Sequence, residues 1–123
     1  MNGEGKRWRK SLFGPFPGKF GEALWQPATD VYRTPEGWLV KLDLAGVRPE
    51  DVEVSVRGSC LIVQGTRRDW TQEAGCCQYR LEIAYSHFER QITLPDDLEH
   101  AHVRLEQWHG MLLVHIQREA HQR

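Results

Sequence analysis

The sequence predicts an all-β protein that folds as one antiparallel β-sandwich. From residue 28 onward, apolar and polar residues alternate with a period of two in short segments, the pattern of strands that bury one face. Turn-forming residues separate these segments, and no segment has the apolar spacing of a helix of three turns or more. Seven short strands at this spacing favour two packed sheets. A chain of 123 residues, 40% hydrophobic and 27% charged, suits one soluble domain.

The alternation places each strand in turn. The predicted strands cover residues 29–33, 38–44, 52–57, 61–66, 88–94, 103–105 and 111–116. Residues 111–116 are apolar on both faces, which is typical of a central strand. Glycine and proline mark turns at 35–37, 46–49, 57–59, 95–97 and 109–110.

Residues 1–27 differ from the rest, because glycine and proline oppose regular structure there while large apolar side chains recur. This segment is predicted to be a flexible N-terminal arm. It either packs on its own domain or presents an apolar surface to other proteins. Its candidate client-binding residues are Trp8, Leu12, Phe13, Phe16, Phe20, Leu24 and Trp25.

Residues 67–84 interrupt the rhythm of short strands. This connection is polar and much longer than the usual hairpin loop of about 2–5 residues. A connection of this length in a compact β domain is either disordered or functional, for example by reaching a neighbouring subunit.

Charge and cysteine content argue against several other classes of protein. A formal charge of −1 gives no basic field for nucleic acid, and no apolar run approaches the roughly 18 residues of a membrane span. The basic N-terminus lacks the apolar core of a signal peptide. Three cysteines, Cys60, Cys76 and Cys77, do not make a disulfide framework, so a cytoplasmic location is expected and a redox role stays open.

No catalytic, metal or cofactor site is predicted. Zinc needs about four converging ligands, and the adjacent Cys76 and Cys77 point to opposite faces of an extended chain. Ser86 and His87 do not complete a nucleophile–base arrangement, and no glycine-rich phosphate loop precedes a helix. The chain is expected to be neither an enzyme nor a cofactor-binding protein.

Five segments carry a resemblance to a known family. Residues 42–47 (LDLAGV) are similar to a D-L-P-G-V turn with Ala45 in place of proline, and 49–54 (PEDVEV) to K-E-D-I-x-V. Residues 61–65 (LIVQG) match L-x-I-x-G. Tyr85 with 88–95 (FERQITLP) matches Y-x-x-F-x-R-x-F-x-L-P, and 108–114 (WHGMLLV) is similar to x-N-G-V-L-x-V. In this order the segments resemble the small heat-shock proteins, the α-crystallin-domain family, over roughly residues 28–117.

The resemblance implies an immunoglobulin-like sandwich that dimerises. It divides the chain into the arm 1–27, the α-crystallin domain 28–117 and a tail 118–123. In the bacterial and plant branch of the family, a long loop such as 67–84 supplies a strand to the partner's sheet. Candidate interface residues are Trp70, Tyr79, Glu82 and Arg90.

Arg90 has two interpretations, because it is in register with apolar residues of its strand. One is an arginine that extends its charge to solvent at the sheet edge. The other, favoured by the resemblance, is an intersubunit ion pair with an acceptor such as Glu82, Asp96 or Asp97.

The family's assemblies usually depend on an Ile-x-Ile motif in the C-terminal tail, which docks in a groove of the sandwich. Residues 117–123 contain no such pair, and Val114-His115-Ile116 lies within a predicted strand. A dimer or small oligomer is therefore expected rather than a large cage. The groove is expected to stand open to clients or to another small heat-shock protein's tail, lined by Val54, Val56, Val103 and Leu105.

The resemblance implies an ATP-independent holdase that binds partly unfolded proteins and prevents their aggregation. Its expected partners are these clients, a second copy of the chain, and other small heat-shock proteins in hetero-oligomers. The alternative is a monomeric β-sandwich co-chaperone or adaptor that docks on another chaperone. Such proteins usually have short loops, so the length of residues 67–84 argues for the holdase.

Overall fold

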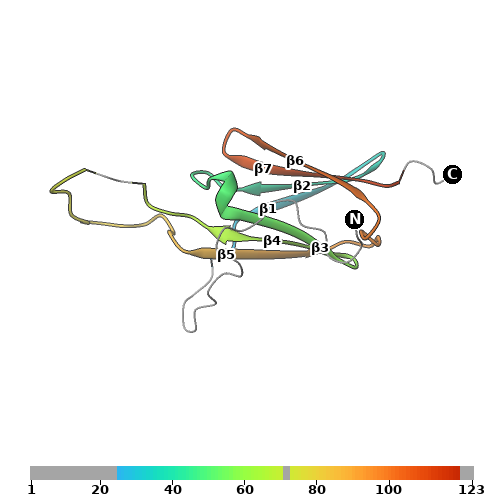
Figure 1. Cartoon of the computed structure of the whole chain (residues 1–123), viewed down its shortest axis with the longest axis horizontal. Coiled ribbons are helices and arrows are strands. Elements are labelled where there is room, and N and C mark those ends of the chain that lie inside the picture. The colour runs from blue at the N-terminus through green and yellow to red at the C-terminus, as the bar shows by residue number, and fades with distance from the viewer. Residues whose placement is uncertain (1–24, 71–72, 120–123) are drawn as a thin grey trace.

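Two antiparallel sheets face each other in the computed structural model, which describes residues 25–70 and 73–119 (Figure 1). One sheet has the strand order β1-β2-β7-β6 and the other the order β3-β4-β5. The strands are β1 (Thr29–Thr34), β2 (Gly37–Asp43), β3 (Val52–Arg57), β4 (Cys60–Thr66), β5 (His87–Thr93), β6 (His102–Trp108) and β7 (Met111–Gln117). The predicted all-β sandwich is confirmed.

Strand boundaries agree closely with the alternation, with two differences. β6 extends to Trp108, well beyond the predicted 103–105, because each of its residues, inward or outward, pairs with a residue of β7. A single 3-10 turn, η1 (Pro49–Asp51), precedes β3 where only a turn was expected. Pro49 at its first position has the fixed φ that such a turn needs.

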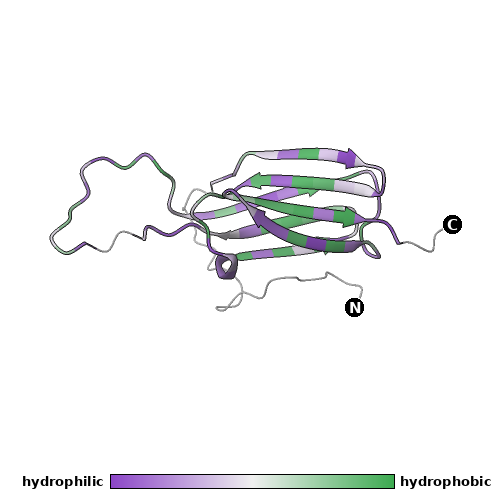
Figure 2. Ribbon diagram, turned by 90° about the horizontal axis from the view of Figure 1, so that it is seen from above, coloured by the Kyte–Doolittle hydropathy of each residue, from purple (hydrophilic) through white to green (hydrophobic). Residues whose placement is uncertain are grey.

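The core lies between the two sheets and consists of inward residues of β2 to β7 together with residues of the connections, such as Leu44 and Leu98. Figure 2 shows the alternation of apolar and polar residues along the strands. The side chains that are at most 2% exposed are mainly leucine and valine: Val40, Leu42, Leu44, Val54, Val56, Leu61, Val63, Phe88, Leu98, Val114 and Ile116. Removing this apolar surface from water is the main force that holds the sheets together.

Gly65 shows why one position of the L-x-I-x-G segment is glycine. It lies on β4 opposite Phe88 of β5, and its inward side faces the core. A Cβ there would collide with the Asp51 carbonyl oxygen and lie 2.7 Å from the Phe88 ring. The absent side chain thus lets Phe88, only 1% exposed, fill the space between the sheets.

The connection between β4 and β5 projects away from the sandwich (Figures 1 and 2). Its described residues, 67–70 and 73–86, belong to no strand of either sheet. Each sheet also has two edge strands, β1 and β6 in one sheet and β3 and β5 in the other. The fold therefore leaves an unpaired segment of chain beside edges that can accept a strand.

Candidate dimerisation and binding surfaces

The base of the projecting loop is held to the domain by arginine side chains. Arg67 donates through Nε to the Ala84 carbonyl at 2.9 Å and through Nη1 to the Ala45 carbonyl at 3.0 Å. Its backbone N–H donates to the Ser86 carbonyl at 3.1 Å. Arg67 thus joins the outgoing and returning ends of the loop to the turn that follows β2.

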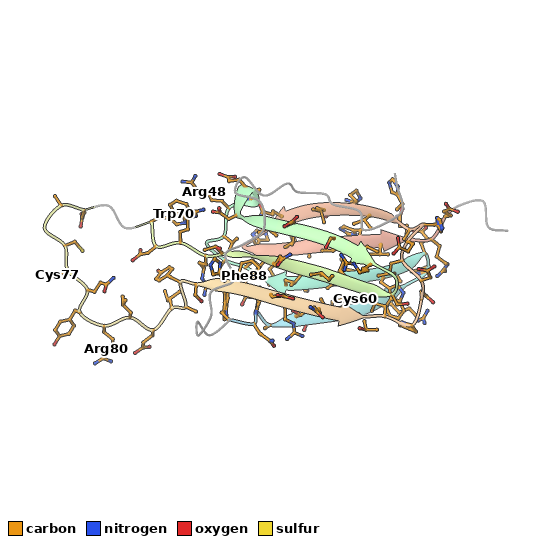
Figure 3. The ribbon with its side chains drawn as sticks, turned by 60° about the horizontal axis from the view of Figure 1, so that its bottom comes forward. Arg48, Cys60, Trp70, Cys77, Arg80 and Phe88 are labelled. Atoms are coloured by element: carbon orange, nitrogen blue, oxygen red, sulfur yellow. The ribbon has the colours of Figure 1, made fainter. Side chains whose placement is uncertain are left out.

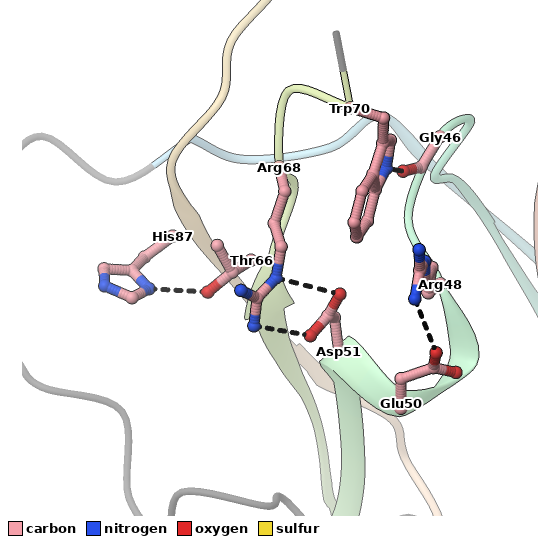
Figure 4. Close-up of polar contacts among 8 residues, drawn as sticks. All are labelled: Gly46, Arg48, Glu50, Asp51, Thr66, Arg68, Trp70 and His87. Carbon is pink, nitrogen blue, oxygen red and sulfur yellow. Dashed lines mark hydrogen bonds and ion pairs between the residues drawn. The ribbon is translucent and has the colours of Figure 1, made fainter. Parts of the chain in front are cut away.

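Arg68, the next residue, forms a bidentate ion pair with Asp51 of the 3-10 turn (Figure 4). Its Nε and Nη2 atoms lie 3.1 Å and 2.9 Å from the two carboxylate oxygens. The Asp51 side chain is 8% exposed and that of Arg68 is 43% exposed. Two parallel charge-assisted bonds fix the direction as well as the position of the outgoing chain.

Trp70, a candidate interface residue, contacts its own domain. Its indole N–H donates to the Gly46 carbonyl at 3.2 Å, and the guanidinium of Arg48 lies 3.8 Å from the ring centroid (Figure 4). Arg48 in turn pairs with Glu50 at 3.3 Å. Trp70 is 38% exposed, so one part of the ring anchors the loop base while another part stays accessible.

The outer part of the loop is exposed and makes few contacts with the sandwich (Figure 3). Tyr79 is 98% exposed, and Leu81 and Ile83 are more than half exposed. Glu82 pairs with its neighbour Arg80 at 3.6 Å, but both side chains are about three-quarters exposed, so this pair contributes little stability. These apolar side chains have no burial site within the described part of the chain.

Arg90 faces inward from β5, in register with the apolar residues as the sequence predicts. It lies opposite Val63 on β4, between the buried Phe88 and Ile92. Its Nη1 donates to the Gln26 side chain at 3.4 Å, and its buried Nε has no hydrogen-bond partner among the described residues. A buried guanidinium Nε without a hydrogen-bond partner at a sheet edge is unusual and calls for an acceptor.

Two of the acceptors proposed for Arg90 have other roles within the chain. Asp96 accepts the Trp38 indole N–H at 2.8 Å. Asp97 accepts the backbone N–H of Glu99 at 3.1 Å. Both lie in the β5–β6 connection, and neither pairs with Arg90 in its own chain, so an intersubunit pair between Arg90 and one of them stays a prediction.

The predicted groove residues are not an open surface. Val54 and Val56 are 0% exposed, Val103 is 8% exposed, and Leu105 is partly buried against the same core. The physical reason is that all four point into the space between the sheets, where the alternation that suggested a groove also produces the core. The expectation of an open groove lined by these side chains is therefore wrong for this structure.

Trp25 corrects the proposed client-binding set. Its ring meets Phe88 edge to face, with centroids 5.2 Å apart and planes at 80°, and it packs on the core. Its backbone N–H donates to the His87 carbonyl at 3.0 Å, which forms a short parallel bridge to β5. Trp25 is thus part of the domain rather than a free binding residue. The other candidates of the arm, Trp8 to Leu24, lie outside the described residues.

The sequence predicts β1 as a strand but not as a binding surface, although it carries exposed apolar side chains. Four of its six residues are exposed, including Val31 at 43% and Tyr32 at 44%. Its alternation is weak, because no residue on either face of β1 is buried. A signal that could have found this surface is the pair of β-favouring residues Val31 and Tyr32, which are exposed and do not contribute to the core.

Other classes of site find no support in the described residues. No three His, Cys, Asp or Glu side chains among residues 25–70 and 73–119 are grouped to hold a metal ion. None of the helices in that part of the chain is long and apolar enough to cross a membrane. Cys60, Cys76 and Cys77 are free thiols, and only the last two are exposed.

Comparison with known proteins identifies the family. Residues 30–123 match the profile of the Hsp20/alpha crystallin family. The chain belongs to this family. Among curated relatives, Spore protein SP21 of Stigmatella aurantiaca is 31% identical over 99 residues, covering 80% of this chain and 59% of that protein. An 18.1 kDa class I heat shock protein of Oryza sativa is 30% identical over 121 residues, covering 95% of this chain and 75% of the relative.

Solved structures of small heat-shock proteins share the fold. One from Xylella fastidiosa aligns with a TM-score of 0.65 at 27% identity, covering 82% of this chain and 93% of that one. Heat shock protein 16.0 from Schizosaccharomyces pombe aligns with a TM-score of 0.69 at 24% identity, covering 76% and 87%. The chain of this Hsp20/alpha crystallin protein spans about half to three-fifths of the length of most curated relatives it matches.

The Arg68–Asp51 ion pair is expected to stabilise the folded domain. Asp51→Asn removes the charge that two guanidinium bonds satisfy, and we expect a loss of ~1–3 kcal/mol in the free energy of unfolding, measured by urea denaturation. Glu50→Gln is the matched control, because Glu50 forms an exposed pair with Arg48 and should cost less than ~1 kcal/mol. Equal losses for the two variants would contradict the role of the Asp51 pair.

Proposed function

We propose that this protein is an ATP-independent chaperone, a holdase that binds partly unfolded proteins and prevents their aggregation. The observation that carries the proposal is the match of residues 30–123 to the Hsp20/alpha crystallin family. Relatives named as heat shock proteins support it. Its expected partners are unfolding clients and a second copy of the chain, with small oligomers or hetero-oligomers as further assemblies. Its expected location is the cytoplasm.

The proposed binding mechanism is hydrophobic capture by the N-terminal arm. An unfolding client exposes apolar surface, and the arm residues Trp8 to Leu24 bury it while the charged sandwich keeps the complex dissolved. Binding of this kind lowers the concentration of free aggregation-prone chains by mass action and needs no nucleotide. Trp25 is left out of this set, since it packs on Phe88.

The proposed dimer forms by exchange of the loop 67–84 between chains. Residues 73–86 pair with neither sheet of their own chain, and they carry the exposed apolar side chains Tyr79, Leu81 and Ile83. The outer side of β1 offers unpaired N–H and C=O groups together with exposed Val31 and Tyr32. Pairing of the loop with the partner's β1 satisfies both surfaces at once.

Arg90 is the proposed polar contact of this dimer, with the partner's Glu82 as its acceptor. The guanidinium has a buried Nε without a hydrogen bond, and Glu82 holds only a solvent-exposed pair with Arg80 in its own loop. An exchanged loop that brings a carboxylate to the β5 edge would satisfy the donor that one chain leaves unpaired.

The arm is tested by removing residues 1–24 and keeping Trp25. We expect a folded protein with an unchanged dimer mass that no longer suppresses aggregation of a heat-unfolded client, measured by light scattering at increasing chaperone ratio. The matched control is a full-length chain in which the large apolar residues of the arm are replaced by serine, and it should lose suppression to a similar degree. Undiminished suppression by either variant contradicts the proposed role of the arm.

Loop exchange is tested by replacing residues 71–83 with a short glycine–serine linker. The shortened chain cannot reach a partner, so light scattering should give the mass of one shortened chain, below the 14.3 kDa of the full chain, instead of two. A second variant keeps the loop at full length and replaces Tyr79, Leu81 and Ile83 with serine. It separates the contribution of apolar contacts to dimer formation from the contribution of loop length. A persistent dimer of the shortened chain refutes exchange, and a monomeric parent chain favours the co-chaperone alternative.

The Arg90–Glu82 contact is tested by charge exchange. Arg90→Glu and Glu82→Arg should each raise the dimer dissociation constant tenfold or more, because each places like charges together. The double variant should recover most of the affinity, measured by sedimentation at several concentrations. Arg80→Gln is the control, since it removes the exposed Arg80–Glu82 pair without changing the charge of either proposed contact residue. Additive losses in the double variant contradict the pairing.

A further inference from the structure

Arg67 occupies a junction that the sequence does not indicate. Besides its bonds to Ala84 and Ala45, its guanidinium lies 3.8 Å from the centroid of the Trp25 ring. A single side chain therefore touches the end of the N-terminal segment, the returning end of the loop and the turn after β2. These three segments come from distant parts of the sequence and meet at the base of the loop, where β4 ends and β5 begins (Figure 1).

Trp25 connects this junction to the core. Its ring contacts Phe88 in the core and also the guanidinium of Arg67. Arginine suits this position because its planar group stacks on an aromatic face while its edge donates to carbonyls, which lysine cannot do at the same time. Withdrawal of Trp25 from Phe88 would remove the surface on which the Arg67 group rests.

The loop ends depend on the same guanidinium. Arg67 Nε donates a hydrogen bond to the Ala84 carbonyl, and the Arg67 backbone N–H donates one to the Ser86 carbonyl. The distance between the two ends of the loop therefore depends on where Arg67 lies. The other anchors of the loop base, Trp70 with Arg48 and Arg68 with Asp51, do not involve Trp25. Arg67 therefore joins the N-terminal segment to the loop.

We propose that Arg67 is a positioning residue that couples the N-terminal arm to the dimerisation loop, through its simultaneous contacts with Trp25 and Ala84. Docked Trp25 favours the loop geometry that exchanges with a partner, and a client that draws the arm away weakens the dimer. Because coupling between two sites is reciprocal, dimerisation weakens client binding by the same factor. This inference rests on the proposed arm and loop functions.

A double-variant cycle in the full chain tests the coupling. Trp25→Leu keeps apolar volume against Phe88 but removes the aromatic face, and Arg67→Lys keeps the charge but removes the planar group. Each should raise the dimer dissociation constant about threefold or more, and the double variant should raise it no further than the larger single effect. The control cycle pairs Trp25→Leu with Arg48→Lys, which loosens the loop base at Trp70 without touching Trp25, and its effects should multiply.

Hydrogen exchange of the backbone provides a second measurement that does not need a dimer. Trp25→Leu should speed exchange in peptides covering residues 80–87, and adding Arg67→Lys should speed it no further. The proposal is overturned if the effects of Trp25→Leu and Arg67→Lys on the dissociation constant multiply in the double variant. It is also overturned if Trp25→Leu leaves hydrogen exchange in residues 80–87 unchanged. If every form is monomeric, the proposed dimer fails, while the exchange cycle still decides whether Arg67 couples the two segments.

Discussion

The unpaired backbone of the sandwich edges is the constraint on which the rest of this structure depends. Two sheets with the orders β1-β2-β7-β6 and β3-β4-β5 have four edge strands, of which β1 carries exposed apolar side chains and β5 leads into the projecting loop. The chain covers part of the β5 edge itself, through the bridge of Trp25 to Phe88. Within the described residues β1 receives no such cover. Since an uncovered edge invites pairing, the surfaces of interest gather around these two strands.

A series of packing contacts connects the core and the β5 edge to the base of the loop. Gly65 leaves room for Phe88, Phe88 supports Trp25, and Trp25 supports the guanidinium of Arg67. Each contact is an ordinary one, but together they connect the centre of the sandwich to the two ends of the projecting loop. A change of volume at Gly65 would therefore displace the loop base as well as the core, because close-packed interiors transmit small shifts.

The sequence predicts the strands well because alternation reports directly on burial. It cannot tell which inward residues line an accessible groove, and Val54 and Val56 show this limit, since the same alternation places them at 0% exposure. Trp25 was assigned to the arm on composition alone, while its edge-to-face contact with Phe88 depends on tertiary structure. Arg67 was missed because an arginine in a polar segment carries no signal until three distant partners are in place. Arg90 was found because a charge interrupted an apolar register.

Magnitudes explain why the loop needs anchors at its base. Burying a leucine or isoleucine side chain contributes about 1.5–3 kcal/mol, whereas ordering each backbone residue costs roughly 1–2 kcal/mol. The exposed Tyr79, Leu81 and Ile83 therefore cannot by themselves order the segment 73–86 on a partner. Arg67 and Arg68 reduce that cost, because they fix both loop ends and the outgoing direction before any partner arrives. Preorganisation of this kind makes the loop base as important for the affinity of the proposed dimer as the surface that the loop is proposed to contact.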